Sequence, residues 1–257
     1  MGMTRVKSPE QLKSMRESCH ILSLILKELE EMTVPGISTM DLERRAEELC
    51  VKYKVISAFK GFHGYPYVLC TSVNDEVVHA FPNNHILKEG DILSIDGGVV
   101  VNGMVSDSAV AVIVGGKTTP VAQALVDTCI QALWAGIKQV KANCHIGDIG
   151  HAVQTVVEAA GFHVIQELTG HGIGEEMHEQ PYILNYGEPG EGTQLRAGMT
   201  ICIEPIISAG KPAIETIDDD WTIVTRDHSL SMQHEHTILV TETGYEVLTL
   251  RPGENVL

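Results

Sequence analysis

The chain has 257 residues, a formal net charge of −16 and 44% hydrophobic residues. This length is ample for one large or two small domains, and no run approaches the roughly 18 apolar residues of a membrane-spanning helix. The acidic balance argues against DNA or an anionic membrane as a partner. The six cysteines form no Cys-x-x-Cys pair, so we expect reduced thiols and a cytoplasmic protein.

The first half begins with two predicted helices. Ser8 is a candidate N-cap and Gln11 completes a capping box, after which apolar residues recur at helical spacing until about Glu31. A second helix, capped by Ser38 or Thr39, is expected to extend to about residue 53. Short strands are predicted over 55–59, 68–73 and 76–80, with His79 close to the end of the last one.

An Asn102-Gly103 pair between two apolar, β-branched runs predicts a tight hairpin. With these two residues as the loop, Gly98 pairs with Asp107, and side-chain alternation places Asp96 on the same face. Two carboxylates in an apolar strand pair admit three interpretations. They hold a cation, they share one proton as a dyad, or they lie on a solvated sheet face.

The second half shows a similar order of elements. A long helix is predicted from Thr119 and Pro120 to about residue 137, and a shorter one from about Asp148 to Ala160. Strands are expected over 162–165, 199–205, 221–225, 235–241 and 245–250. The recurrence suggests two halves, roughly 8–115 and 119–250, that form an α+β arrangement with helices on a mostly antiparallel sheet.

Further acids interrupt apolar strands in the second half. Glu204 follows Ile201-Cys202-Ile203, and Glu235 precedes another apolar run, while His171 lies in a Gly-x-Gly segment. Acids are seldom buried without a partner, so we expect these residues to join Asp96 and Asp107 in one site. Four carboxylates and one imidazole favour Mn²⁺ or Fe²⁺ and accept Co²⁺ or Zn²⁺. So much negative charge fits two bridged ions better than one.

The chain resembles the type I methionine aminopeptidases in their short bacterial form, over nearly its whole length. The motifs are the aspartates around Asn102-Gly103, then Gly170-His171-Gly172-Ile173-Gly174 with His178, Glu179 and Pro181, then Ile203-Glu204-Pro205, and finally Gln233-His234-Glu235-His236-Thr237. This ordered set is far more specific than a lone histidine or acid pair.

The resemblance implies a pita-bread fold, a pseudo-twofold duplication that forms a single catalytic domain over residues 1–257. It implies removal of the initiator methionine from nascent proteins and peptides whose second residue is small, by attack of a metal-bound water on the first peptide bond. Two divalent ions, of manganese, iron or cobalt with zinc as an alternative, would be the cofactors. Their ligands would be Asp96, Asp107, His171, Glu204 and Glu235.

The resemblance also assigns roles around the metals. Glu204 would move protons, His178 would donate a hydrogen bond to the scissile carbonyl, and His79 would contact the amide or amine of the substrate. His236 should point away from the site, because it follows the ligand Glu235 along a strand. The methionine pocket would be lined by Phe59, Phe62, His63, Tyr65, Cys70, Met177 and Trp221. Relatives often have Tyr at position 62, Phe at 177, and Gly at 80 and 106.

Two other functions compete with this interpretation. A proline-directed aminopeptidase or prolidase shares the fold but usually carries an extra N-terminal domain, whereas the first helix here begins near Ser8. A non-catalytic pita-bread binding protein typically loses metal ligands, whereas all five positions are filled here. The expected partners are nascent polypeptide N-termini, with transient ribosome association expected from the role, and a monomer is the default for the family.

Overall fold

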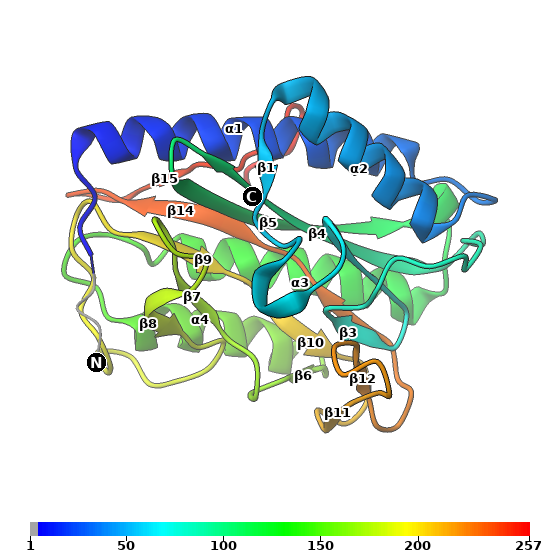
Figure 1. Ribbon diagram of the computed structural model, residues 1–257. Coiled ribbons are helices and arrows are strands. Elements are labelled where there is room, and N and C mark those ends of the chain that lie inside the picture. The colour runs from blue at the N-terminus through cyan, green and yellow to red at the C-terminus, as the bar shows by residue number, and fades with distance from the viewer. Residues whose placement is uncertain (1–4) are drawn as a thin grey trace.

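The computed structural model describes residues 5–257 (Figure 1). Its α-helices are α1 (Pro9–Met32), α2 (Thr39–Tyr53), α3 (Pro120–Ile137) and α4 (Ile146–Ala159), with short 3-10 turns η1 (Phe62–Gly64) and η2 (Val114–Gly116). The strands of the first half are β1 (Ile56–Ser57), β2 (Leu69–Val73), β3 (Glu76–Val78), β4 (Ile92–Val101) and β5 (Met104–Ile113). Those of the second half are β6 (His163–Val164), β7 (Gly170–Gly172), β8 (Glu179–Ile183), β9 (Thr200–Ile203), β10 (Ile206–Ser208), β11 (Ile214–Thr216), β12 (Ile223–Thr225), β13 (Ser231–Gln233), β14 (His236–Val240) and β15 (Tyr245–Val247).

Side-chain caps set the start of each helix as the sequence predicts, with one correction. At α1, the Gln11 N–H donates to Ser8 Oγ at 3.2 Å and the Ser8 N–H donates to Gln11 Oε1 at 2.8 Å. Ser38, not Thr39, caps α2. Helix α4 begins two residues before the predicted Asp148, because the Asp148 carboxylate accepts the His145 N–H at 2.7 Å and so closes the first turn from inside it.

The predicted hairpin is confirmed in its register. Strands β4 and β5 are antiparallel, Val101 pairs with Met104, and Gly98 pairs with Asp107. Every strand pair in the described part of the chain is antiparallel, and the longest sheet of the second half has the order β15-β14-β9-β7-β8. The expectation of a mostly antiparallel sheet is therefore confirmed.

Several short strands escape sequence-based prediction. Strands β7, β8, β10, β11 and β13 have three to five residues each and lie in segments where the sequence analysis expects no strand. The predicted strand over 199–205 is shorter in the structure, because β9 ends at Ile203, before Glu204 and Pro205, and a separate strand β10 begins at Ile206. Strands this short are stabilised by their neighbours in the sheet, so their own side-chain pattern carries little signal.

Helices from both halves pack against the strands (Figure 1). Helix α1 packs on β4 and β5, and its Leu22, Leu26 and Leu29 share a core with residues of α2, β2 and β4. Helices α3 and α4 pack on each other, and their apolar side chains join those of β9, β10, β13 and β14. Across residues 5–257, no helix is both long enough and apolar enough to cross a membrane.

The two halves meet where β5 runs beside the start of β14. The Glu235 N–H donates to the Ala109 carbonyl at 3.0 Å, and Ser108 Oγ donates to the Glu235 carbonyl at 2.7 Å. Thr237 Oγ1 donates to the Asp107 carbonyl at 2.7 Å. These bonds place Asp107 from one half beside Glu235 from the other.

Candidate active site

A buried cluster of acids lies at the junction of the two halves. Asp96 lies on β4, Asp107 on β5, His171 on β7, Glu204 just after β9 and Glu235 just before β14. His171 Nε2 lies 3.6 Å from Asp107 Oδ2 and 3.7 Å from Glu204 Oε1. One ligand atom from each of Asp107, His171, Cys202 and Glu235 lies within 4.8 Å of the others. The structure thus brings residues up to 139 positions apart (Asp96 to Glu235) to one place.

The glycines beside His171 make this close approach of strands feasible. A Cβ on Gly170 would lie 2.3 Å from the Cys202 carbonyl oxygen, and a Cβ on Gly172 would lie 2.5 Å from the Gln180 carbonyl oxygen. Strand β7 is therefore held so tightly between β9 and β8 that only glycine fits on either side of the imidazole. The Gly-His-Gly segment is a packing requirement that also aims His171 at the acids.

The imidazole of His171 has one nitrogen available for a cation. Its Nδ1 lies 2.9 Å from the Gly172 carbonyl oxygen, which can only accept, so Nδ1 carries the proton. Burial lowers the pKa of His171 to about 4, which keeps the ring neutral. The lone pair of Nε2 then faces Asp107 and Glu204, as in a metal-binding histidine whose other nitrogen is held by a carbonyl.

The carboxyl groups resist ionisation unless a cation joins them. Burial and the neighbouring Asp107 raise the pKa of Asp96, and burial raises the pKa of Asp107 itself to about 7. Burial and the other acids likewise raise the pKa values of Glu204 and Glu235. Four carboxyl groups beside one neutral imidazole therefore form a site in which ionisation becomes favourable when a cation balances the charge.

Unpartnered oxygen atoms support the cation interpretation. Asp96 Oδ1, Asp107 Oδ1 and Glu235 Oε1 are buried and have no hydrogen-bond partner in the described structure. The interpretation as a solvated sheet face is wrong, because all five side chains are buried. Shared protons would satisfy one pair of acids, whereas four acids with three unpartnered oxygens fit divalent cations better.

Two residues of this cluster were missed by the sequence analysis. Gln233 Nε2 donates to Glu204 Oε2 at 3.2 Å, and the Cys202 thiol lies among the acids. Burial raises the pKa of Cys202 well above its usual range, so its sulfur stays a thiol. Each lies two residues before a predicted ligand on an extended segment, and that spacing was the available signal.

A cavity of about 350 Å³ opens beside the cluster and contains the two predicted catalytic histidines. The ring centroids of His171 and His178 are 4.4 Å apart, and those of His79 and Trp221 are 6.5 Å apart. Burial and the neighbouring histidines lower the pKa values of His79 and His178 to about 4. Both rings are neutral at pH 7, so each can donate one hydrogen bond.

Six of the seven predicted pocket residues line this cavity, namely Phe59, Phe62, Tyr65, Cys70, Met177 and Trp221. His63 is the exception. Its backbone has a positive φ of 49° in η1, and its side chain is exposed and packs edge-on against Phe62. Among the other lining residues are Glu167, Thr169 and Tyr182, which the sequence analysis did not single out.

The unusual residues Ala80 and Ser106 lie away from the cavity wall. Ser106 is fully buried, and its Oγ lies 2.9 Å from Ser18 Oγ on α1 and 3.3 Å from the Val99 carbonyl oxygen. Ala80 supplies carbonyl contacts to Tyr65 and Thr71. His236 points away from the acids, as expected, toward Thr249 and Glu254.

Comparisons with known proteins agree with this architecture. The profile of metallopeptidase family M24 matches residues 13–242. The chain is 41% identical over 243 residues to methionine aminopeptidase 1 of Bacillus subtilis, covering 95% of this chain and 98% of that protein. It superposes on methionine aminopeptidase from Thermotoga maritima with a TM-score of 0.94 at 43% identity, covering 96% of this chain and 99% of that one.

A prolidase from Pyrococcus furiosus shares the fold alone, with a TM-score of 0.76 at 20% identity over 96% of this chain and 66% of that one. The pita-bread expectation is confirmed by these structural matches. With the family profile covering most of the chain and a close likeness to two bacterial enzymes over nearly their full length, the chain belongs to metallopeptidase family M24 and, within it, to the methionine aminopeptidases.

Proposed function

We propose that this protein removes the N-terminal methionine from nascent proteins and peptides whose second residue is small. One observation carries the proposal: four buried carboxyl groups and a neutral histidine adjoin a cavity lined mainly by aromatic and apolar side chains. The cluster is built to hold cations, and the cavity is suited to an apolar side chain. A peptide's first residue would enter the cavity with its scissile bond beside the cluster.

The acids would hold two divalent ions of manganese, iron or cobalt, with zinc as an alternative. The donors are hard oxygens plus one imidazole nitrogen, and three of the oxygens lack any other partner. When bound, such ions supply a Lewis acid and make water a usable nucleophile near neutral pH. The proposed ligands are Asp96, Asp107, His171, Glu204 and Glu235.

The side chains around this centre divide the remaining work. Glu204, held by Gln233 at one oxygen, would accept a proton from the attacking water and pass it to the departing amine. His178 would donate its N–H to the scissile carbonyl oxygen, where negative charge develops. His79 would contact the substrate amide. Both histidines are neutral at pH 7, so they would act as hydrogen-bond donors and not as fixed charges.

The methionine side chain would lie among Phe59, Phe62, Tyr65, Met177 and Trp221. Tyr65 is a fixed wall of this pocket, because its hydroxyl donates to the Leu69 carbonyl at 2.8 Å and its ring packs edge-on against Trp221 at 5.0 Å. Met177 is flexible and can adapt to the thioether of the substrate.

The wider setting is also a proposal. Hydrogen bonds between β5 and the β14 segment support one catalytic domain composed of the two halves. All six cysteines are free, which supports a cytoplasmic location. Ribosome association and a monomeric state stay predictions from the proposed role.

Peptide hydrolysis tests the proposal against its rivals. Metal-stripped protein should release no methionine from Met-Ala-Ser, and addition of Mn²⁺ or Co²⁺ should start the reaction, while Ala-Pro-Ala stays intact. Cleavage of Ala-Pro-Ala alone would identify a proline-directed peptidase. Metal binding without cleavage of either peptide would indicate a binding protein.

A further inference from the structure

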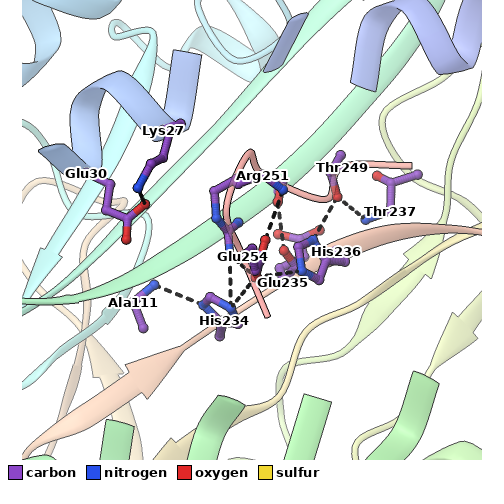
Figure 2. A network of polar contacts seen from close by, with 11 residues as sticks. Lys27, Glu30, Ala111, His234, Glu235, His236, Thr237, Thr249, Arg251 and Glu254 are labelled. Carbon is purple, nitrogen blue, oxygen red and sulfur yellow. Dashed lines mark hydrogen bonds and ion pairs between the residues drawn. The ribbon is translucent and has the colours of Figure 1, made fainter. Parts of the chain in front are cut away.

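A second buried polar network lies next to Glu235 along the chain (Figure 2). It joins His234 and His236, the two neighbours of Glu235, to Arg251 and Glu254 near the C-terminus. His234 and Glu254 line a separate cavity of about 340 Å³, whereas Glu235 lines the active-site cavity. Residues 234–236 thus direct the Glu235 carboxylate toward the active-site cavity and the His234 and His236 imidazoles toward the opposite side.

Both imidazoles converge on one carboxylate oxygen. Glu254 Oε1 lies 3.1 Å from His236 Nε2 and 3.6 Å from His234 Nε2, and it also accepts a hydrogen bond from Arg251 Nη2. Glu254 Oε2 accepts the Arg251 N–H at 3.0 Å. The carboxylate therefore joins the last turn of the chain to both sides of Glu235.

The remaining ring nitrogens are also held. The Ala111 N–H donates to His234 Nδ1 at 3.0 Å, so Nδ1 is unprotonated, and His234 Nε2 lies 3.1 Å from Arg251 Nη2 and 3.6 Å from Glu254 Oε1. His236 Nδ1 lies 3.0 Å from Thr249 Oγ1, which in turn accepts the Thr237 N–H at 3.0 Å. Each ring thus has a polar contact at both of its nitrogens, which favours one orientation of the ring (Figure 2).

This cluster is not itself suited to a metal. His234, His236 and Glu254 have ligand atoms within 4.8 Å of one another, but the Arg251 guanidinium already provides the positive charge at the carboxylate. Arg251 and Glu254 form the ion pair of this network, and Arg251 Nη1 is buried without a hydrogen-bond partner in the described structure.

Glu235, by contrast, is held mainly through its backbone, and the neighbouring Cys202 thiol is the hydrogen-bond partner of its side chain. Its N–H and carbonyl are bonded to β5, while its Oε1 has no hydrogen-bond partner in the described structure. We propose that Glu254 is a positioning residue, which fixes the two imidazoles behind Glu235 and so aims the Glu235 carboxylate at the metal ions. The proposal rests on the metal centre of the proposed function, and it makes the C-terminal turn a support of that centre.

The substitution Glu254→Gln tests this role, because it keeps the size of the side chain but removes the charge that gathers the donors. Glu246→Gln is the matched control: Glu246 on β15 accepts two bonds from Arg16, at 2.8 and 2.7 Å, and its side chain is 42% exposed. Titration calorimetry of metal-stripped full-length protein with Mn²⁺ measures the affinity, and circular dichroism with thermal unfolding checks the fold.

We expect Glu254→Gln to weaken Mn²⁺ binding by about tenfold, as loss of a support behind a metal ligand commonly does, and Glu246→Gln to leave it unchanged. An affinity of Glu254→Gln within twofold of the parent would overturn the positioning role. If Glu254→Gln fails to fold, Thr249→Val takes its place, because it removes the contact between Thr249 Oγ1 and His236 Nδ1. An Mn²⁺ affinity of Thr249→Val within twofold of the parent would then overturn the positioning role.

The two proposals fail in different ways. A parent that binds Mn²⁺ but leaves Met-Ala-Ser intact would overturn the proposed activity and leave the positioning role standing. A lower number of bound ions in Glu254→Gln, with unchanged affinity for those that remain, would overturn positioning and make the C-terminal network a metal site of its own.

Discussion

Replacing Lys7 with methionine should weaken the fold and the site together. The Lys7 ammonium lies 2.6 Å from Glu179 Oε2, and the two side chains are only 3% and 6% exposed. Glu179 Oε1 accepts the Glu175 N–H at 2.9 Å, which closes the turn that carries Met177 and His178. Lys7 therefore supplies the countercharge for the carboxylate that shapes this turn.

Methionine matches lysine in length but carries no charge, so Lys7→Met leaves the Glu179 carboxylate buried beside an uncharged side chain. Breaking a buried ion pair in this way typically costs about 3–5 kcal/mol of unfolding free energy. At about 2–4 °C per kcal/mol for a chain of this size, the melting temperature should fall by about 6–20 °C. The turn should loosen, and kcat should fall because His178 adjoins Glu179.

Urea unfolding followed by circular dichroism measures the stability, and Arg5→Met is the control. Arg5 pairs with Glu175 at 2.7 Å, but both side chains are about half exposed (52% and 50%). That pair should contribute less than about 1 kcal/mol. The double variant Lys7→Met with Glu179→Gln should recover part of the loss, because it no longer buries a charge. Equal stabilities of Lys7→Met and Arg5→Met would refute the reasoning.

Three further predictions concern other parts of the fold. Burial raises the pKa of the Glu76 carboxyl group to about 7. As the pH rises, the unfolded chain therefore loses the Glu76 proton before the folded protein does, and the contribution of Glu76 to the free energy of unfolding, which is complete at low pH, is lost as the pH rises through 7. In thermal unfolding, the melting temperature of Glu76→Gln should therefore rise relative to that of the parent between about pH 5 and 8. A difference in melting temperature that does not change with pH would contradict this. Gly172→Ala should cost about 1–3 kcal/mol in urea unfolding because its Cβ would meet the Gln180 carbonyl, whereas Gly244→Ala, which meets nothing within 4 Å, should be near neutral. Trp221→Ala should raise KM for Met-Ala-Ser about tenfold, with a smaller effect on kcat, in steady-state kinetics; an unchanged KM would place methionine elsewhere.

Local signals in the sequence were sufficient for much of this architecture. Ser8 and Ser38 cap the first two helices as predicted, and the Asn102-Gly103 loop alone sets the register that pairs Gly98 with Asp107. These features depend on residues within a few positions of one another. The acids inside apolar strands were equally visible, because burying a carboxylate is costly enough to need an explanation.

Features that depend on distant segments could not be predicted in this way. Strand β7 forms only because β8 and β9 lie on either side of it, and Gln233 was found only when the fold placed it against Glu204. His63 shows the converse, since a local turn exposes a residue that the family resemblance placed in the pocket.

By itself, then, the sequence determined the caps of the first two helices, the hairpin register and the presence of acids inside apolar strands, because each depends on short-range geometry or on the cost of burying a charge. Only the tertiary structure decided how these acids meet, how Lys7 supports the turn of His178 and how the C-terminal Glu254 lies behind Glu235. Such contacts join residues far apart in the chain. Their energy comes from burial and charge pairing that exist only after the two halves have packed together.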